Sequence, residues 1–181
     1  MKILFALSIL YLFTLQVSVA KSASAPNCNI NEIEISIADY AYCEKKDDLK
    51  KIELISGDHP SLYVKAKKIE YSFSRLPVSF AILNIPEKLN ISRVTFFNRL
   101  SDREFNDIKF RKMRKAFDIY QNTVVTQYNK QHFSAISIIN KDSTNNSIYI
   151  YRNESQFIYL VKGSFNKMFS DQFLTNLISR Q

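Results

Sequence analysis

Two short phrases that alternate along the chain constrain its fold more than any other feature. One phrase has apolar residues two positions apart, and the other reads F-x-x-[LIM]. The first phrase begins at Ile69, Val94, Phe117 and Ile148, and the second begins at Phe80, Phe105, Phe133 and Phe165. Apolar residues two apart form a strand with one buried face. Because a single unit of 23–32 residues cannot bury that face alone, the alternation indicates repeats that stack on one another.

The stretch Ile148–Met168 shows the pattern most completely. An alternating strand is followed by Asn153 and then by Gly163-x-Phe165-x-x-Met168. An asparagine at a bend bonds the backbone through its side chain, so that a turn can be buried without unpaired amides. This stretch resembles one unit of a leucine-rich repeat, and it is two residues longer than the usual form.

We therefore predict an α/β fold, namely a short irregular leucine-rich-repeat solenoid. Its expected parts are an N-terminal cap over residues 21–64, about four irregular units over residues 65–168 and a C-terminal capping helix over residues 169–181. The chain has two glycines and four prolines, which argues against a loop-rich sandwich with many tight turns. The alternative is that the phrases are ordinary strands and helices of an irregular α/β domain.

Residues 1–20 have the pattern of a secretory signal peptide. Lys2 precedes an apolar run, and Ser18-Val19-Ala20 is a small-x-small cleavage site. The alternative is an uncleaved membrane anchor, but the apolar run is shorter than the ~20 residues that a span prefers. We expect a secreted, extracellular protein with no stable membrane span after cleavage.

Three N-x-[ST] sequences are candidate glycosylation sites in a secreted chain. They lie at Asn90, Asn145 and Asn153. Asn145 belongs to a polar loop and is the best candidate. Asn153 carries no glycan if it is the buried bend asparagine of the repeat.

Cys28 and Cys43 are the only cysteines, and in an oxidising compartment they most simply pair with each other. The loop that they close contains an alternating strand, Ile33-x-Ile35-x-Ile37. Such a disulfide either caps the open edge of the repeat stack or acts as a local crosslink without a capping role. An intermolecular disulfide is a further alternative.

The signal peptide, the cysteine pair and the phrases Ile69-Glu-Tyr71 and Leu76-Pro77 resemble the secreted leucine-rich repeat proteins of insects. The mosquito leucine-rich repeat immune proteins are the most similar in style. The resemblance implies a non-enzymatic binder of a protein partner in innate immune recognition. Members of that family carry more repeats, C-terminal cysteines and a coiled coil, so the resemblance implies no particular heterodimer partner here.

In such a solenoid the alternate strand positions face a concave sheet, which is the expected protein-binding surface. These positions are Arg93, Thr95, Phe97, Asp118, Tyr120, Gln121, Tyr149, Tyr151 and Arg152. Exposed aromatic residues and arginines are typical of a binding patch. The alternative is that the aromatic side chains pack against one another across strands.

The run Lys109–Lys115 places five basic residues within seven, with Phe110 and Met113 three apart. This spacing directs the apolar side chains inward and the basic ones outward. The run is either a binding site for anionic surface glycans or a solvated face. A net charge of +8 favours acidic partners, and we expect no nucleic-acid partner because the chain is expected outside the cell.

We predict no catalytic, cofactor or metal site. The two histidines, His59 and His132, belong to no recognisable catalytic or zinc motif, and the cysteines have no histidine nearby. The remaining alternative function is a carrier whose interior, rich in Phe and Ile, binds a small hydrophobic ligand.

Overall fold

The computed structural model describes residues 26–141 and 144–180. The strands are β1 (Glu32–Ile37), β2 (Tyr40–Lys45), β3 (Leu49–Ile55), β4 (Ser61–Ala66), β5 (Glu70–Pro77), β6 (Thr123–Asn129), β7 (Ser134–Asn140), β8 (Asn146–Tyr151), β9 (Phe157–Ser164) and β10 (Ile178–Ser179). The helices are α1 (Ile85–Lys88), α2 (Arg93–Ser101), α3 (Ile108–Ala116) and α4 (Lys167–Asn176), with short 3-10 turns η1 (Lys46–Asp48) and η2 (Ala81–Asn84). The expected signal peptide, residues 1–20, lies outside the described residues.

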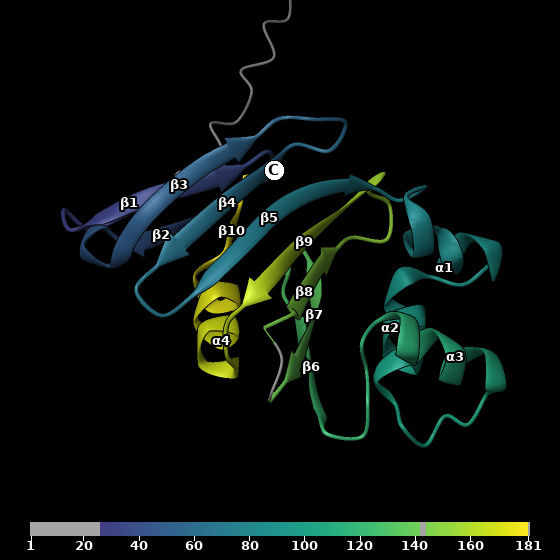
Figure 1. The fold of residues 1–181 in the computed structure, drawn as a ribbon. Helices are drawn as coiled ribbons and strands as arrows, with labels where there is room; N and C mark the ends of the chain where they lie inside the picture. The colour runs from purple at the N-terminus through teal and green to yellow at the C-terminus, as the bar shows by residue number, and fades with distance from the viewer. Residues whose placement is uncertain (1–25, 142–143, 181) are drawn as a thin grey trace, which may run out of the picture.

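Two antiparallel sheets organise the chain (Figure 1). Seven strands form the large sheet in the order β3-β4-β5-β9-β8-β7-β6, and three form the small sheet in the order β1-β2-β10. Strand β5 pairs along its whole length with β9, from Glu70 opposite Ser164 to Pro77 opposite Phe157. In a solenoid each unit contacts only its neighbours along the chain. The predicted leucine-rich-repeat solenoid is therefore wrong, and the fold is a mixed α/β, antiparallel, sandwich-like one.

The argument against a sandwich also fails, because the turns use residues other than glycine. Ala38, between β1 and β2, has φ 45°, Asn90 has φ 52° and Asp118 has φ 57°. These values lie in the left-handed region, which asparagine and aspartate enter more readily than most residues. A low glycine content therefore did not exclude tight turns in this chain.

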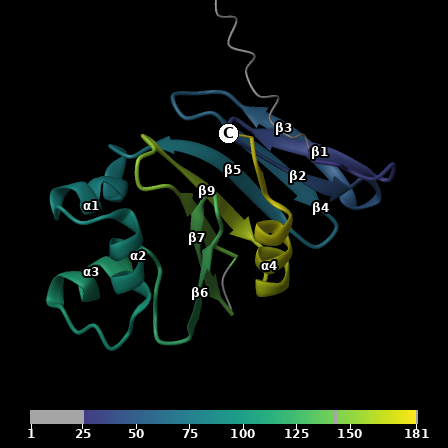
Figure 2. The same cartoon turned by 180° about the vertical axis from the view of Figure 1, so that it is seen from behind.

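The middle of the large sheet is covered on both faces, whereas its edge strand β3 is mostly exposed. One face packs against the small sheet and α4, through residues such as Tyr42, Phe73 and Phe173. The other face packs against α2 and α3, through residues such as Phe97 and Phe110. Figure 2 shows α4 and the group α1–α3 on opposite sides of the sheet. Strand β8 lies between β9 and β7, and all six of its residues are buried.

The recurring phrases lie on different kinds of element. Ile148 begins the alternating part of β8, as expected, whereas Val94 lies in α2 and Phe117 lies just after α3. Phe96, Phe97 and Leu100 are buried on α2 with one-residue and three-residue spacing, which is the pattern of a helix face. Ser92 begins this helix by accepting a hydrogen bond from the Thr95 N–H group at 3.0 Å. The expected strand at residues 94–98 is therefore a helix.

The disulfide between Cys28 and Cys43 is confirmed, and it ties the segment before β1 to β2. The disulfide does not cap a repeat stack, because the fold contains two antiparallel sheets instead of stacked repeats. The helix expected over residues 169–181 is present only in part, because α4 ends at Asn176 and residues 178–179 form β10. Asn166 begins α4 by accepting a hydrogen bond from Phe169 N–H at 3.0 Å. Helix α4 packs into the core rather than closing a stack. None of the helices among the described residues is long and apolar enough to cross a membrane.

Candidate functional site

The aromatic residues expected on an exposed concave face are buried. Phe97, Tyr149 and Tyr151 are 1%, 8% and 2% exposed. The Phe97 ring stacks on Tyr151 with centroids 4.4 Å apart, and it lies 5.9 Å from the Tyr149 ring. The prediction that these three side chains form a binding surface is wrong, because α2 covers the face of the sheet from which the two tyrosines project. The alternative, aromatic packing within the protein, describes them correctly.

The other predicted contact residues are separated by the fold. Arg93 and Thr95 lie on α2, and Thr95 is half-buried. Asp118, Tyr120 and Gln121 lie in the turn between α3 and β6, whereas Arg152 follows β8. These residues come from three separate parts of the chain and form no common sheet face. Protein binding as such stays a prediction, without the surface proposed for it.

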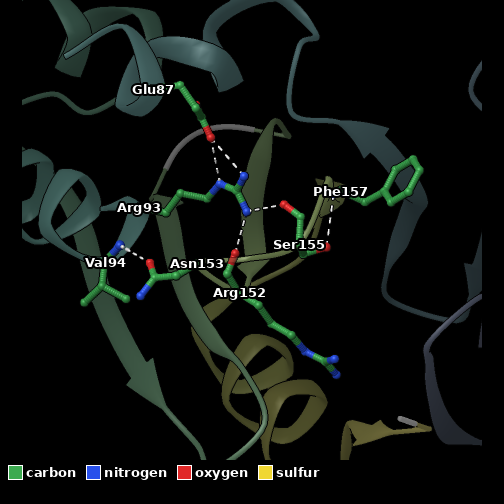
Figure 3. A network of polar contacts seen from close by, with 7 residues as sticks. All are labelled: Glu87, Arg93, Val94, Arg152, Asn153, Ser155 and Phe157. Atoms are coloured by element: carbon green, nitrogen blue, oxygen red, sulfur yellow. Dashed lines mark hydrogen bonds and ion pairs between the residues drawn. The ribbon is translucent and has the colours of Figure 1, made fainter. Parts of the chain in front are cut away.

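Arg93 has a structural role that the sequence did not reveal (Figure 3). Its buried guanidinium group donates hydrogen bonds to the carbonyl oxygens of Arg152 and Ser155. It also pairs with Glu87, through Nη2 to Oε1 at 2.9 Å. The Val94 N–H group donates to Asn153 Oδ1 at 3.3 Å. Together these contacts attach the β8–β9 connection to the start of α2.

The predicted orientation of the basic run is confirmed for most of its residues. Helix α3 begins at Asp107, whose carboxylate accepts from the N–H groups of Lys109 and Phe110 at 2.6 and 3.3 Å. Phe110 is buried and Met113 is half-buried. The exposed cationic residues form what we term the α3 basic face, which consists of Lys109, Arg111, Lys112 and Lys115.

Arg114 is the exception, because its side chain points into the molecule. It is 9% exposed, and within the described residues its guanidinium group donates hydrogen bonds to backbone carbonyl oxygens. These oxygens belong to Leu100, Arg99, Asp102 and Phe105. Arg114 therefore joins α3 to the end of α2 and to the loop that follows it.

A hollow of about 410 Å³ lies beside the α3 basic face. We term it the α3 hollow, and its lining includes Arg103, Arg111, Arg114, Lys115, Ile119 and Tyr120. Gln121 completes the described lining, so that no acidic residue belongs to it. The hollow thus combines a cluster of positive charge with an apolar and aromatic surface.

Several of these side chains are held in place. Arg103 donates to the carbonyl oxygens of Gln121 and Thr123 at 2.8 and 2.5 Å. Tyr120 is 55% exposed, and its hydroxyl donates to Asp118 Oδ1 at 3.2 Å. This hydrogen bond to a carboxylate raises the pKa of Tyr120 above its ordinary value. The Tyr120 N–H group donates to Thr123 Oγ1 at 2.8 Å, which fixes the turn.

The α3 basic face is not neutralised by neighbouring carboxylates. In residues 26–141 and 144–180, the ion pairs involve Lys51, Lys65, Lys67, Arg93, Lys167 and Arg180. None of the four cationic side chains of the face takes part in one of them. Its charge is therefore available to an external anion.

The two histidines form no recognisable catalytic arrangement. The His59 ring packs edge-on against Phe80, with centroids 4.8 Å apart. His132 lies in an open hollow of about 530 Å³ that also contains Lys130 and Glu154. Within the described part of the chain, no group of three or more His, Cys, Asp or Glu side chains is placed to bind a metal ion.

The candidate glycosylation sites are all at the surface. Asn90, Asn145 and Asn153 are exposed. Asn153 is not the buried bend asparagine of a repeat, so the conflict seen in the sequence does not arise. Glycosylation at these three positions stays a prediction.

No protein-family model, no curated protein and no solved structure matches this chain.

Proposed function

We propose that this protein is a secreted, non-enzymatic binder of anionic glycans and that the α3 basic face is its contact surface. The observation that carries the proposal is the set of four exposed cationic side chains on α3, none of which is paired with a carboxylate of the described chain. Unpaired surface charge attracts a polyanion over about a Debye length, which is ~8 Å at physiological salt.

The cell compartment is part of the same proposal. The disulfide between Cys28 and Cys43 is compatible with an oxidising, extracellular environment. The signal-like pattern of residues 1–20 supports the same location. Anionic polymers outside cells are mainly sulfated and carboxylated glycans, and this is why we propose glycans rather than nucleic acid.

Retention on immobilised heparin in a salt gradient tests the proposal. A variant with Lys109, Arg111, Lys112 and Lys115 changed to glutamine removes the face. The matched control changes Lys50, Lys51, Lys65 and Lys67 to glutamine, which removes the same charge from β3, β4 and the turn after β4. Three of those lysines are paired with carboxylates.

We expect the unmodified protein to be retained and to elute as salt rises. The face variant should elute at much lower salt, whereas the control should elute close to the unmodified protein. Equal losses in both variants would mean that net charge alone causes retention, and the proposal would then be wrong. Binding to a protein partner and transport of a small hydrophobic ligand stay predictions that this experiment leaves aside.

A further inference from the structure

The α3 hollow differs from an ordinary cationic surface because it contains an exposed aromatic ring. Tyr120 is 55% exposed and lies beside Ile119, Arg111 and Lys115 in the lining of the hollow. Phosphate or sulfate alone requires only cations, so an aromatic surface suggests a ligand that also has an apolar face. A pyranose ring has such a face, formed by its C–H groups, and it packs on aromatic rings.

The hollow is an open depression of limited size. Its volume of about 410 Å³ falls within the roughly 300–1,000 Å³ range of ligand pockets, although it lies open at the surface instead of enclosing a ligand. This volume suits one or two sugar units better than a long polymer segment. A polymer would bind here through one unit, while its neighbouring anionic groups contact the α3 basic face.

The side chains are organised before any ligand binds. Tyr120 is fixed through Asp118 and Thr123, and Arg103 is fixed through backbone carbonyl oxygens. Holding groups in their bound positions reduces the entropy lost on binding. Arg111 and Lys115 are exposed and make no ion pair within the described residues, so they are the groups that reach the anion.

We propose that the α3 hollow is a subsite for one anionic pyranose unit of a glycan, with Tyr120 packing on the sugar ring and Arg111 and Lys115 binding its sulfate or carboxylate group. This inference rests on the proposed function, which it makes more specific. Asp118 stays engaged with the Tyr120 hydroxyl, so that the ring rather than the hydroxyl makes the contact.

Isothermal titration of the full-length protein with two polyanions tests the subsite. One is a heparin-derived tetrasaccharide and the other is inorganic polyphosphate, which has charge but no sugar ring. Tyr120→Ala removes the ring, and Tyr120→Phe keeps the ring while removing the hydroxyl. Thermal unfolding of each variant checks that the fold is kept, as expected for an exposed side chain.

We expect Tyr120→Ala to weaken tetrasaccharide binding about fivefold, as for the loss of an aromatic contact, and to leave polyphosphate binding unchanged. Tyr120→Phe should bind the tetrasaccharide more tightly than Tyr120→Ala because it keeps the ring, and slightly more weakly than the unmodified protein because the hydrogen bond to Asp118 that holds the ring is lost. Equal effects of Tyr120→Ala on the two ligands, or none on either, would overturn the subsite while leaving the basic face as the binding surface. If the unmodified protein binds neither ligand, the proposed function itself is wrong.

Arg111→Gln combined with Lys115→Gln provides the complementary measurement. Binding of both polyanions should weaken, and the salt dependence of binding should become less steep, because fewer counterions are released. Retention of full tetrasaccharide affinity by this double variant would show that the sugar binds elsewhere on the molecule, and the subsite would be rejected.

Discussion

The guanidinium group of Arg114 donates a hydrogen bond through Nε to the carbonyl oxygen of Leu100 at 2.9 Å. Leu100 lies near the C-terminal end of α2, where the last carbonyl groups of a helix have no partner within the helix. Arg114 supplies that partner from α3, and its Nη2 atom also reaches the Phe105 carbonyl oxygen at 2.9 Å. One arginine of the basic run therefore stabilises the fold, while its neighbours remain at the surface.

We predict that Arg114→Gln lowers the free energy of unfolding by about 2–3 kcal/mol. Its loss leaves partly buried carbonyl oxygens without a charged donor, and unsatisfied buried groups cost about 1–3 kcal/mol each. Urea denaturation followed by circular dichroism measures the change. Arg111→Gln is the matched control on the same helix, since Arg111 is exposed and its loss should alter stability by less than about 0.5 kcal/mol. Similar losses in the two variants would show that Arg114 is not a specific link between α2 and α3.

Gly163 is predicted to tolerate no larger residue. It lies on β9 opposite Tyr71 of β5, and a Cβ atom there would be 2.1 Å from the Glu70 carbonyl oxygen and 2.5 Å from Tyr71 Cα. Both contacts are with backbone, which must shift to make room. We expect Gly163→Ala to lower the free energy of unfolding by about 1–3 kcal/mol or more, as for overpacked cores, as measured by thermal and urea unfolding.

The only other glycine provides the comparison. A Cβ atom at Gly57 would meet nothing within 4 Å. Gly57→Ala should therefore leave stability within about 0.5 kcal/mol of the unmodified protein. If the two substitutions cost the same, close approach of β5 and β9 does not explain the presence of Gly163.

Stability is predicted to fall steeply in alkali because several tyrosines are buried. Burial raises the pKa of Tyr149 to about 12 and raises the pKa of Tyr42, Tyr71 and Tyr151 as well. A raised pKa in the folded state means that stability is fully present below the unfolded pKa, about 10, and is lost as pH rises above it. Ultraviolet absorbance of tyrosinate and far-UV circular dichroism, recorded in one titration, should change together.

Tyr151→Phe refines this prediction. The pKa of Tyr151 is raised by burial alone. Removing its hydroxyl should reduce by one the number of protons released on unfolding in alkali, so that the free energy of unfolding falls less steeply as pH rises. Ionisation of the buried tyrosines near pH 10 with the circular dichroism unchanged would contradict the prediction, because it would mean that these hydroxyls reach solvent in the folded state.

The sequence by itself determined the local features that depend on neighbouring residues. The two cysteines predicted one disulfide, and it is present. The alternation at Ile148–Tyr151 predicted a strand, and β8 lies there. The spacing within Lys109–Lys115 predicted an outward basic surface, which is correct apart from Arg114.

The tertiary structure decided the rest, because it depends on contacts between distant segments. The sequence of an alternating strand such as β8 does not indicate whether one face or both faces of the strand are covered. Tyr149 and Tyr151 are buried because the helices α2 and α3 pack against them. A short F-x-x-L phrase fits strands, turns and helices alike, so its recurrence did not define a repeat. Arg93 and Arg114 are charged residues, and from the sequence alone such residues are expected to be exposed to solvent. Only the folded chain brings to them the backbone carbonyl oxygens that make their burial favourable.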